Sequence, residues 1–153
     1  MGVKRVWIIE KGNSRWKIGE FNDDVLINVT TTDVGVELTD LNLPKSDSTS
    51  IEILITGSGN WSNDTLELLK SKGNVTQLRH GDSHPLRTNV TNPGSLGTDR
   101  VANAFAIQEG VIDEALTCNA WLIVDVGTCV TFDLVVDGTH LGGAISPGIS
   151  LRL

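Results

Sequence analysis

Cysteine is scarce in this sequence, and its placement limits what the protein can be. Only Cys118 and Cys129 occur among 153 residues. They lie on either side of a predicted buried strand and do not have the spacing of metal ligands. We therefore predict two reduced core thiols in a protein of the reducing cytosol, with a disulfide between them as the alternative.

Long apolar runs and an excess of positive charge are also missing. No stretch is long and apolar enough to cross a membrane, and the apolar run after Lys4 and Arg5 is short and interrupted by Glu10, unlike a signal peptide. We predict a cytoplasmic protein with no membrane partner. The 12 basic and 19 acidic residues give a net charge of −7, which argues against a nucleic-acid partner. A nucleotide ligand is still allowed, because local N–H groups and one lysine can bind it.

The sequence does contain the alternating and continuous apolar patterns of an α/β fold. Hydrophobic residues make up 39% of the chain, enough for a packed core. Short β-rich segments bounded by turn formers predict strands. These segments are residues 3–9, 15–21, 25–31, 51–56, 75–78, 121–126 and 130–136.

Two helices are expected between these strands. One begins at Asn60 or Ser62, runs to about residue 72 and is ended by Gly73; the other begins at Thr98 or Asp99 and carries an apolar stripe that reaches Val111. Residues 32–43 fit neither periodicity cleanly and weakly favour a helix. Residues 79–96 form a long loop rich in turn formers, and loops of that length are more often functional than idle.

Two segments share one pattern of strand, acid, glycine turn and second strand. The first runs from Trp7 to Gly19 and has its acid at Glu10; the second runs from Leu122 to Asp133 and has its acid at Asp125. A carboxylate at a strand end can face a cation, and a following glycine lets a phosphate approach the backbone. Each pattern alone also fits an ordinary hairpin with a strand-end acid.

A third segment, Leu96-Gly97-Thr98-Asp99-Arg100, places an acid and an arginine at a predicted helix start. Phosphoryl transfer needs bound phosphates, a metal that offsets their charge, and a carboxylate that accepts the nucleophile's proton. Asp99 is the candidate base, and Arg100 could bind a carboxylate or phosphate with two parallel hydrogen bonds. The simpler alternative is that Asp99 only caps its helix.

Together the three segments resemble the type III pantothenate kinases of coenzyme A biosynthesis. Glu10 to Lys17 is similar to the Asp-x-Gly-Asn-Thr/Ser-Arg-x-Lys phosphate loop of that family, and Pro93 to Asn103 to its Pro-x-x-Leu-Gly-x-Asp-Arg segment. Asp125 to Thr131, followed by Gly142 to Gly148, matches its second phosphate loop. The order and spacing of the motifs match from residue 3 to residue 153.

The resemblance implies a ribonuclease H-like fold of the actin/hexokinase ATPase type, with a mixed sheet and flanking helices. It predicts a first domain over residues 1–115 and the start of a second domain over residues 116–153, whose remainder is absent. A second domain cut after its first strands would leave one sheet face uncovered and one edge unpaired. The family also implies a homodimer.

The resemblance further assigns roles to individual residues. ATP would be bound by Glu10, Lys11, Gly12, Asn13, Ser14, Arg15, Trp16, Lys17 and Thr128. Pantothenate would be bound by Val90, Gly97, Thr98, Asp99 and Arg100, with Asp99 as the general base on its primary hydroxyl and Arg100 on its carboxylate side. Asp125 would bind potassium or ammonium, and Glu10 would hold magnesium, directly or through water.

Three departures from the family pattern bear on activity. The first acid is Glu10 where the family has Asp, and a position that the family usually gives to a substrate-contacting Tyr is Val90 in a chain that has no tyrosine. The chain also ends where family members continue. These features leave three alternatives: an ATP-dependent pantothenate kinase, a regulatory or binding relative that has lost catalysis, and a marginally stable truncated product.

The other conspicuous side chains carry no ligand pattern. His80, His84 and His140 are expected on the surface or in loops. The tryptophans are expected to pack in the core or at strand edges. They are Trp7, Trp16, Trp61 and Trp121.

Overall fold

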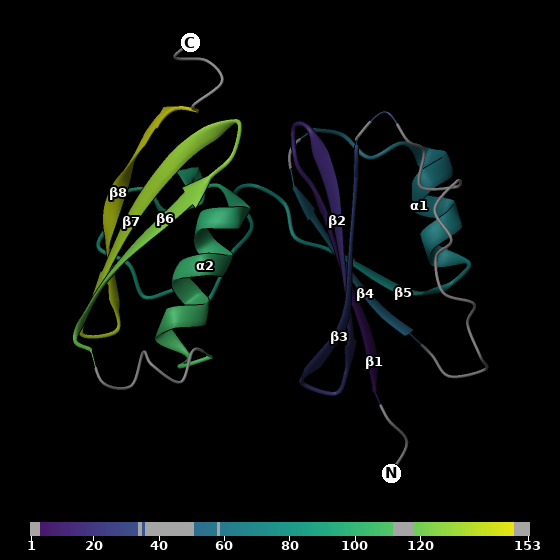
Figure 1. Cartoon of the computed structure of the whole chain (residues 1–153), viewed down its shortest axis with the longest axis horizontal. Coiled ribbons are helices and arrows are strands. Elements are labelled where there is room, and N and C mark those ends of the chain that lie inside the picture. The colour runs from purple at the N-terminus through teal and green to yellow at the C-terminus, as the bar shows by residue number, and fades with distance from the viewer. Residues whose placement is uncertain (1–3, 34, 36–50, 58, 112–117, 149–153) are drawn as a thin grey trace. The chain divides into compact units, whose positions relative to one another are not determined.

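The computed structural model describes residues 4–33, 35, 51–57, 59–111 and 118–148. The chain divides into two compact units, residues 1–79 and residues 80–153. Figure 1 labels the elements of both units, and each unit is described by itself.

The first unit is built on a mixed sheet of five strands in the order β3-β2-β1-β4-β5. Its strands are β1 (Arg5–Lys11), β2 (Arg15–Asn22), β3 (Val25–Asp33), β4 (Ile51–Gly57) and β5 (Gly73–Gln77). The first three form an antiparallel meander, while β4 pairs in parallel with both β1 and β5. The parallel pairs require a crossover, which the chain supplies through helix α1 (Asn63–Lys70) between β4 and β5.

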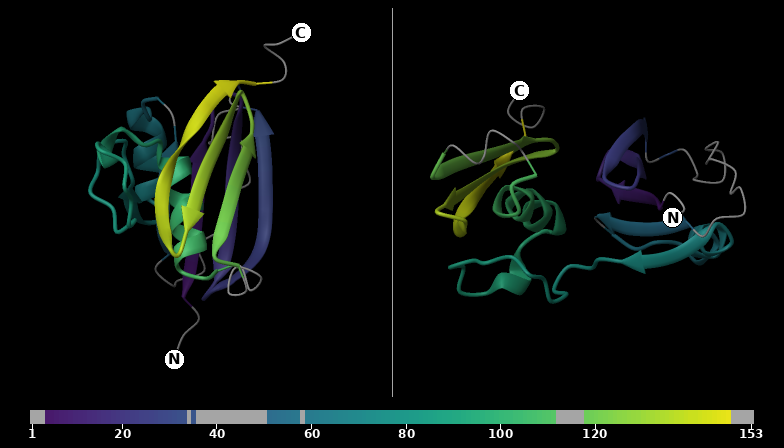
Figure 2. Two further views of the ribbon diagram at one scale, coloured as in Figure 1. Left: turned by 90° about the vertical axis from the view of Figure 1, so that its left-hand side faces the viewer. Right: turned by 90° about the horizontal axis from the view of Figure 1, so that it is seen from below.

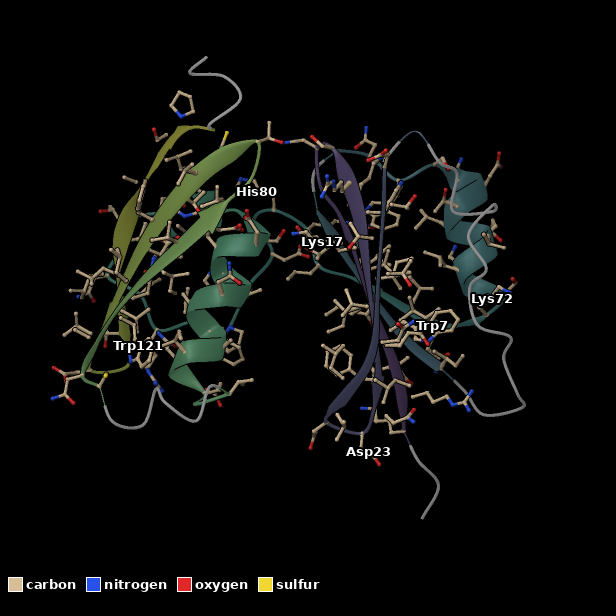
Figure 3. All side chains as sticks on the ribbon, viewed as in Figure 1. Trp7, Lys17, Asp23, Lys72, His80 and Trp121 are labelled. Carbon is tan, nitrogen blue, oxygen red and sulfur yellow. The ribbon has the colours of Figure 1, made fainter. Side chains whose placement is uncertain are left out.

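The core of the first unit lies between this sheet and α1. Alternate residues of β1, β2 and β4 point to one face and are almost fully buried. Figure 3 shows Trp7 on this face, on the side where α1 lies. The buried members are Trp7, Ile9, Trp16, Ile18, Ile51, Ile53, Ile55, Trp61 and Leu69. Ser62 caps α1 by accepting a hydrogen bond from the Thr65 backbone N–H.

The second unit is a three-stranded antiparallel sheet with one helix on one face (Figure 2). Its elements are a short 3₁₀ helix at Pro93–Ser95, α2 (Thr98–Gln108), β6 (Ala120–Val126), β7 (Cys129–Val136) and β8 (Thr139–Pro147). Its core is formed by Leu86 and Leu96 from the loop, Val101 and Ala104 from α2, and Val135 from β7.

The other face of the second sheet is apolar and uncovered within the described residues. Leu122, Val124 and Val126 of β6 are 64%, 47% and 59% exposed, and Leu134 beside them on β7 is 38% exposed. β6 also has no strand paired to its outer edge in the described part of the chain. Within the described residues this sheet therefore has one exposed apolar face and one unpaired edge.

Several predicted element boundaries differ from the structure. Gly73 does not end the first helix, since α1 stops at Lys70 and Gly73 is already the first residue of β5. The second helix ends at Gln108, which leaves Val111 72% exposed instead of on the apolar stripe. Thr32 and Asp33 extend β3, and most of the weakly predicted helix at 32–43 lies outside the described residues.

Three further expectations need correction or comparison. Cys118 and Cys129 are not bonded to each other, as predicted, but both are exposed rather than in the core. Cys129 is the first residue of β7, and Cys118 precedes β6. The compact units divide at residue 79, because α2 packs on β6 and β7 and so belongs to the second unit. The predicted domain boundary was residue 115. In the described part of the chain, no helix has the length and apolarity needed to span a membrane.

Candidate functional site

The first predicted phosphate loop is a tight β1–β2 hairpin. Its turn is closed by the Gly12 N–H, which donates to the Arg15 carbonyl at 2.9 Å. Glu10 and Lys17 lie opposite each other across the two strands, and Lys17 Nζ is 3.2 Å from Glu10 Oε2. Both side chains leave the sheet on the face away from α1, where Figure 3 labels Lys17. Because the Lys17 side chain is 53% exposed and the Glu10 side chain 32% exposed, this ion pair is accessible to a ligand.

Two other residues of this loop are part of the structure that supports it. Trp16 is buried and packs edge-to-face on Trp61 with ring centroids 5.1 Å apart. Lys11 donates to the Asn60 carbonyl at 2.9 Å and its ammonium lies 5.4 Å from the Trp16 ring centre. Trp16 is therefore a core residue, as the tryptophans were expected to be, and a direct contact of its ring with ATP stays a prediction. Asn13, Ser14 and Arg15 form the exposed tip of the turn.

The second predicted phosphate loop joins β6 to β7. The Gly127 N–H donates to the Cys129 carbonyl at 2.8 Å, and the Gly148 N–H donates to the Thr128 carbonyl at 3.0 Å. The second bond ties the end of β8 to the turn and leaves the Thr128 side chain exposed. Asp125 is half-buried and pairs across the strands with Thr131. Strand alternation places Asp125 on the same sheet face as Ile123, which packs toward α2.

Asp99 lies in the first turn of α2 and is exposed. The N-cap residue is Gly97, and no side chain caps this helix, so Asp99 does not act as its cap. A carboxylate in the first turn is stabilised by the positive end of the helix dipole. Asp99 accepts no hydrogen bond from the residues that the structure describes, which leaves its carboxylate available to a substrate.

Arg100, one residue later, is fully engaged on one side. Its Nε donates to Asp133 Oδ2 at 2.8 Å and its Nη2 donates to Asp133 Oδ1 at 2.7 Å. The two side chains are 11% and 2% exposed. The hydrogen bond that Arg100 donates to Asp133 raises the pKa of Arg100; burial opposes this shift, and the charges of Asp133 and Asp99 add to it. Two of the five guanidinium donors are thus committed to Asp133.

His140 continues this network, and its predicted place on the surface or in a loop is wrong. It lies in β8 with an exposed fraction of 0%, with Nε2 2.7 Å from Asp133 Oδ1 and Nδ1 2.9 Å from Thr88 Oγ1. One signal in the sequence pointed to this network. Asp133 occupies a position of β7 that alternates with inward-facing residues such as Val135, and a carboxylate at such a position needs a partner. His80 and His84 do lie in the loop, as expected.

Val90, the predicted substrate-contacting residue of the loop, is half-buried and packs against the core of the second unit. Its N–H donates to Thr88 Oγ1 at 3.1 Å. The predicted substrate segments, Val90 and Gly97 to Arg100, thus belong to one unit together with Asp125 and Thr128. Glu10 to Lys17 belong to the other.

Comparison with known proteins shows the family of the chain. A family model described as type III pantothenate kinase matches residues 6–153. The chain belongs to this family. The expected α/β class with a mixed sheet and flanking helices is confirmed by the observed elements.

Individual relatives show how much of a family member this chain represents. It is 30% identical over 150 residues to a type III pantothenate kinase of Flavobacterium psychrophilum, covering 94% of this chain and 58% of that protein. It is 31% identical over 112 residues to one of Christiangramia forsetii, covering 72% of this chain and 44% of that protein. The chain therefore matches only about half the length of these curated relatives.

A solved structure supports the fold. A Campylobacter jejuni protein assigned to the Baf family of transcriptional activators superposes with a TM-score of 0.54 at 21% identity, covering 95% of this chain and 56% of that one. At this identity the likeness concerns the fold alone.

Proposed function

We propose that this protein transfers the terminal phosphoryl group of ATP to pantothenate and forms 4'-phosphopantothenate, the first step of coenzyme A biosynthesis. The observation that carries the proposal is the exposed Asp99 carboxylate at the start of α2, beside an arginine whose orientation is fixed by Asp133. Membership of the pantothenate kinase family supports the choice of reaction.

The roles of the residues follow from the needs of phosphoryl transfer. Asp99 accepts the proton of the primary hydroxyl as its oxygen attacks the terminal phosphorus, the bond to the bridging oxygen breaks, and ADP leaves. Arg100 orients the substrate through guanidinium donors that Asp133 does not use. Val90, Gly97 and Thr98 line the substrate on the same unit. The Glu10 to Lys17 hairpin and Thr128 bind the phosphates of ATP, which offer oxygens to backbone N–H groups and ammonium ions.

Two cations complete the proposal. Among the described residues no group of three or more His, Cys, Asp or Glu side chains could hold a metal, so ATP oxygens and water would supply most ligands. Carboxylate and phosphate oxygens are the ligands that magnesium prefers. Magnesium at Glu10 would compete with Lys17 and free its ammonium for a phosphate. Potassium or ammonium would be held at Asp125, whose half-buried carboxylate offers the oxygen ligands that such cations take.

The proposed reaction is tested by ADP release from the purified chain with ATP, pantothenate, magnesium and potassium. We expect turnover that Asp99→Asn lowers by about a hundredfold or more, because that is the usual contribution of a general base. Asp137→Asn is the matched control, since Asp137 is an exposed turn residue outside the site. Equal rates in the wild-type protein and the Asp99→Asn variant would contradict the proposal.

A second candidate function is ligand binding without turnover, as a regulatory or binding member of the family. The observation that favours it is Glu10, whose longer side chain reaches Lys17 and holds it in an ion pair. Misplacement of a positioned carboxylate by about 1 Å can cost about a hundredfold in rate. Calorimetry with ATP and pantothenate separately distinguishes the two functions. ATP binding without pantothenate binding or turnover would favour the second function.

The cellular setting belongs to the same proposal. We place the protein in the cytoplasm as a homodimer. The two cysteines that form no disulfide with each other support the reducing compartment, and the exposed apolar face of β6 supports association.

A further inference from the structure

The second unit contains a buried chain of four side chains that no sequence motif predicted. It runs from Thr88 in the loop to His140 in β8, Asp133 in β7 and Arg100 in α2. Its links are between 2.7 and 2.9 Å long. His140 and Asp133 are almost fully buried. Burying such polar groups costs folding free energy unless each one has a hydrogen-bond partner. The hydrogen bonds of this network are therefore part of what allows the unit to fold.

The direction of the hydrogen bonds to Asp133 follows from the chemistry of the carboxylate. Both Asp133 oxygens accept from Arg100, so the carboxylate acts only as an acceptor and His140 Nε2 must donate to it. Thr88 Oγ1 accepts from the Val90 N–H and is also hydrogen-bonded to His140 Nδ1, where either atom can donate because the hydroxyl keeps a second lone pair.

The space for this network is set by Gly143 of β8. A Cβ at that position would collide with the Phe132 backbone carbonyl, and it would also lie 2.7 Å from Asp133 Oδ1 and 2.8 Å from Arg100 Nη2. Any side chain there would push the carboxylate and guanidinium apart. Glycine at this position of β8 is therefore required by the close approach of the β7 backbone, and it also leaves room for the Arg100–Asp133 pair.

The two ends of this hydrogen-bond network lie at the two segments that the proposed function assigns to substrate binding. Val90 is tethered at one end through its backbone N–H, and Arg100 is held at the other by two parallel hydrogen bonds. We propose that Thr88, His140 and Asp133 are positioning residues that fix the Val90 segment and the Arg100 guanidinium in one geometry, so that they bind a carboxylate-bearing alcohol substrate. This inference rests on the proposed kinase function and adds three residues to it.

Replacement of Thr88 tests this inference without leaving a buried charge unpaired. Thr88→Val keeps the shape but removes the hydroxyl, which leaves the Val90 N–H and His140 Nδ1 without their partner. We expect the KM for pantothenate, and its Kd measured by calorimetry without ATP, to rise at least about fivefold, as is usual for an unsatisfied buried group. The KM for ATP should not change. Thr88→Ser retains the hydroxyl and should restore the wild-type values.

Two controls separate positioning from a purely structural role. Thr76→Val makes the same change at an exposed position of β5 in the other unit and should alter neither KM. Thermal unfolding of each variant is measured alongside. Unchanged pantothenate binding by Thr88→Val would overturn the inference, and so would a loss of activity that follows thermal stability and affects both substrates equally. A wild-type protein that binds no pantothenate would overturn the kinase proposal and this inference with it.

Discussion

At the scale of single residues, the most consequential side chain outside the motifs is Asp133. It is 2% exposed and accepts hydrogen bonds from both Arg100 and His140. A buried ion pair contributes little net stability compared with an apolar pair, but removing one partner leaves the other charge uncompensated. The cost of replacing Asp133 is therefore much larger than the net contribution of the pair.

Asp133→Asn tests this residue directly. We expect the free energy of unfolding to fall by about 3 kcal/mol, because Arg100 would remain buried without a counter-charge. Urea unfolding measures the change. Asp137→Asn is the matched control, since Asp137 is exposed with a φ of 47°, a conformation that asparagine also adopts readily. If Asp133→Asn lowers the free energy of unfolding no more than Asp137→Asn does, the Arg100–Asp133 pair does not stabilise the second unit.

Arg100 also fixes how this pair responds to pH. Its pKa is raised, first by the hydrogen bond to Asp133, above an already high ordinary value. A cation with a raised pKa contributes stability that is fully present below the pKa of the unfolded chain and is lost only as the pH rises through the folded value. The guanidinium therefore stays charged across the neutral and moderately alkaline range, and its contribution does not vary there.

At the scale of elements, the first hairpin depends on the strand beside it. Gly57 at the end of β4 pairs with Lys11, and its φ of 122° is a conformation that side chains rarely adopt. A Cβ on Gly57 would also collide with the Lys11 carbonyl. The close approach of β4 to the hairpin thus requires glycine at this position.

Gly57→Ala is expected to lower the free energy of unfolding by more than about 2 kcal/mol, because strain in φ and a backbone collision add together. Gly59→Ala provides the comparison. Gly59 also has a positive φ, of 78°, but nothing lies within 4 Å of its missing Cβ. The Gly59→Ala variant should therefore have a free energy of unfolding only about 1 kcal/mol lower than the wild-type protein. Urea unfolding measures the free energy of unfolding of both variants. An equal decrease in the two would argue against a backbone collision at Gly57.

At the scale of the whole molecule, the chain buries one face of its second sheet and exposes the other. Contiguous apolar surface of this kind promotes association. We expect the 153-residue chain to self-associate through the face formed by Leu122, Val124 and Val126.

The double substitution Leu122→Thr with Val124→Thr should reduce self-association measured by sedimentation, while cooperative unfolding is kept because threonine suits a strand. Val135→Thr changes the opposite face, where the residue is 1% exposed. It should destabilise the unit by about 1–3 kcal/mol by burying a hydroxyl and should leave association unchanged. Unaltered sedimentation of the double variant would exclude this face as the contact.

The sequence by itself determined the family, the two hairpins and the order of most elements. Turn residues such as Gly12 and the alternation in β1 and β2 act over a few residues, so they can be read locally. Boundaries were less accurate where tertiary contacts decide them: β5 begins at Gly73 because it pairs there with Ile51 of β4.

Only the tertiary structure decided which polar side chains meet. Arg100, Asp133, His140 and Thr88 are separated by up to 52 residues, and their hydrogen bonds exist only because α2, β7, β8 and the loop pack in one unit. A histidine without ligand spacing has the same local sequence whether it is exposed or buried. Its surroundings are set by the fold, and so the hydrogen-bond network that joins Val90 to Arg100 became visible only in three dimensions.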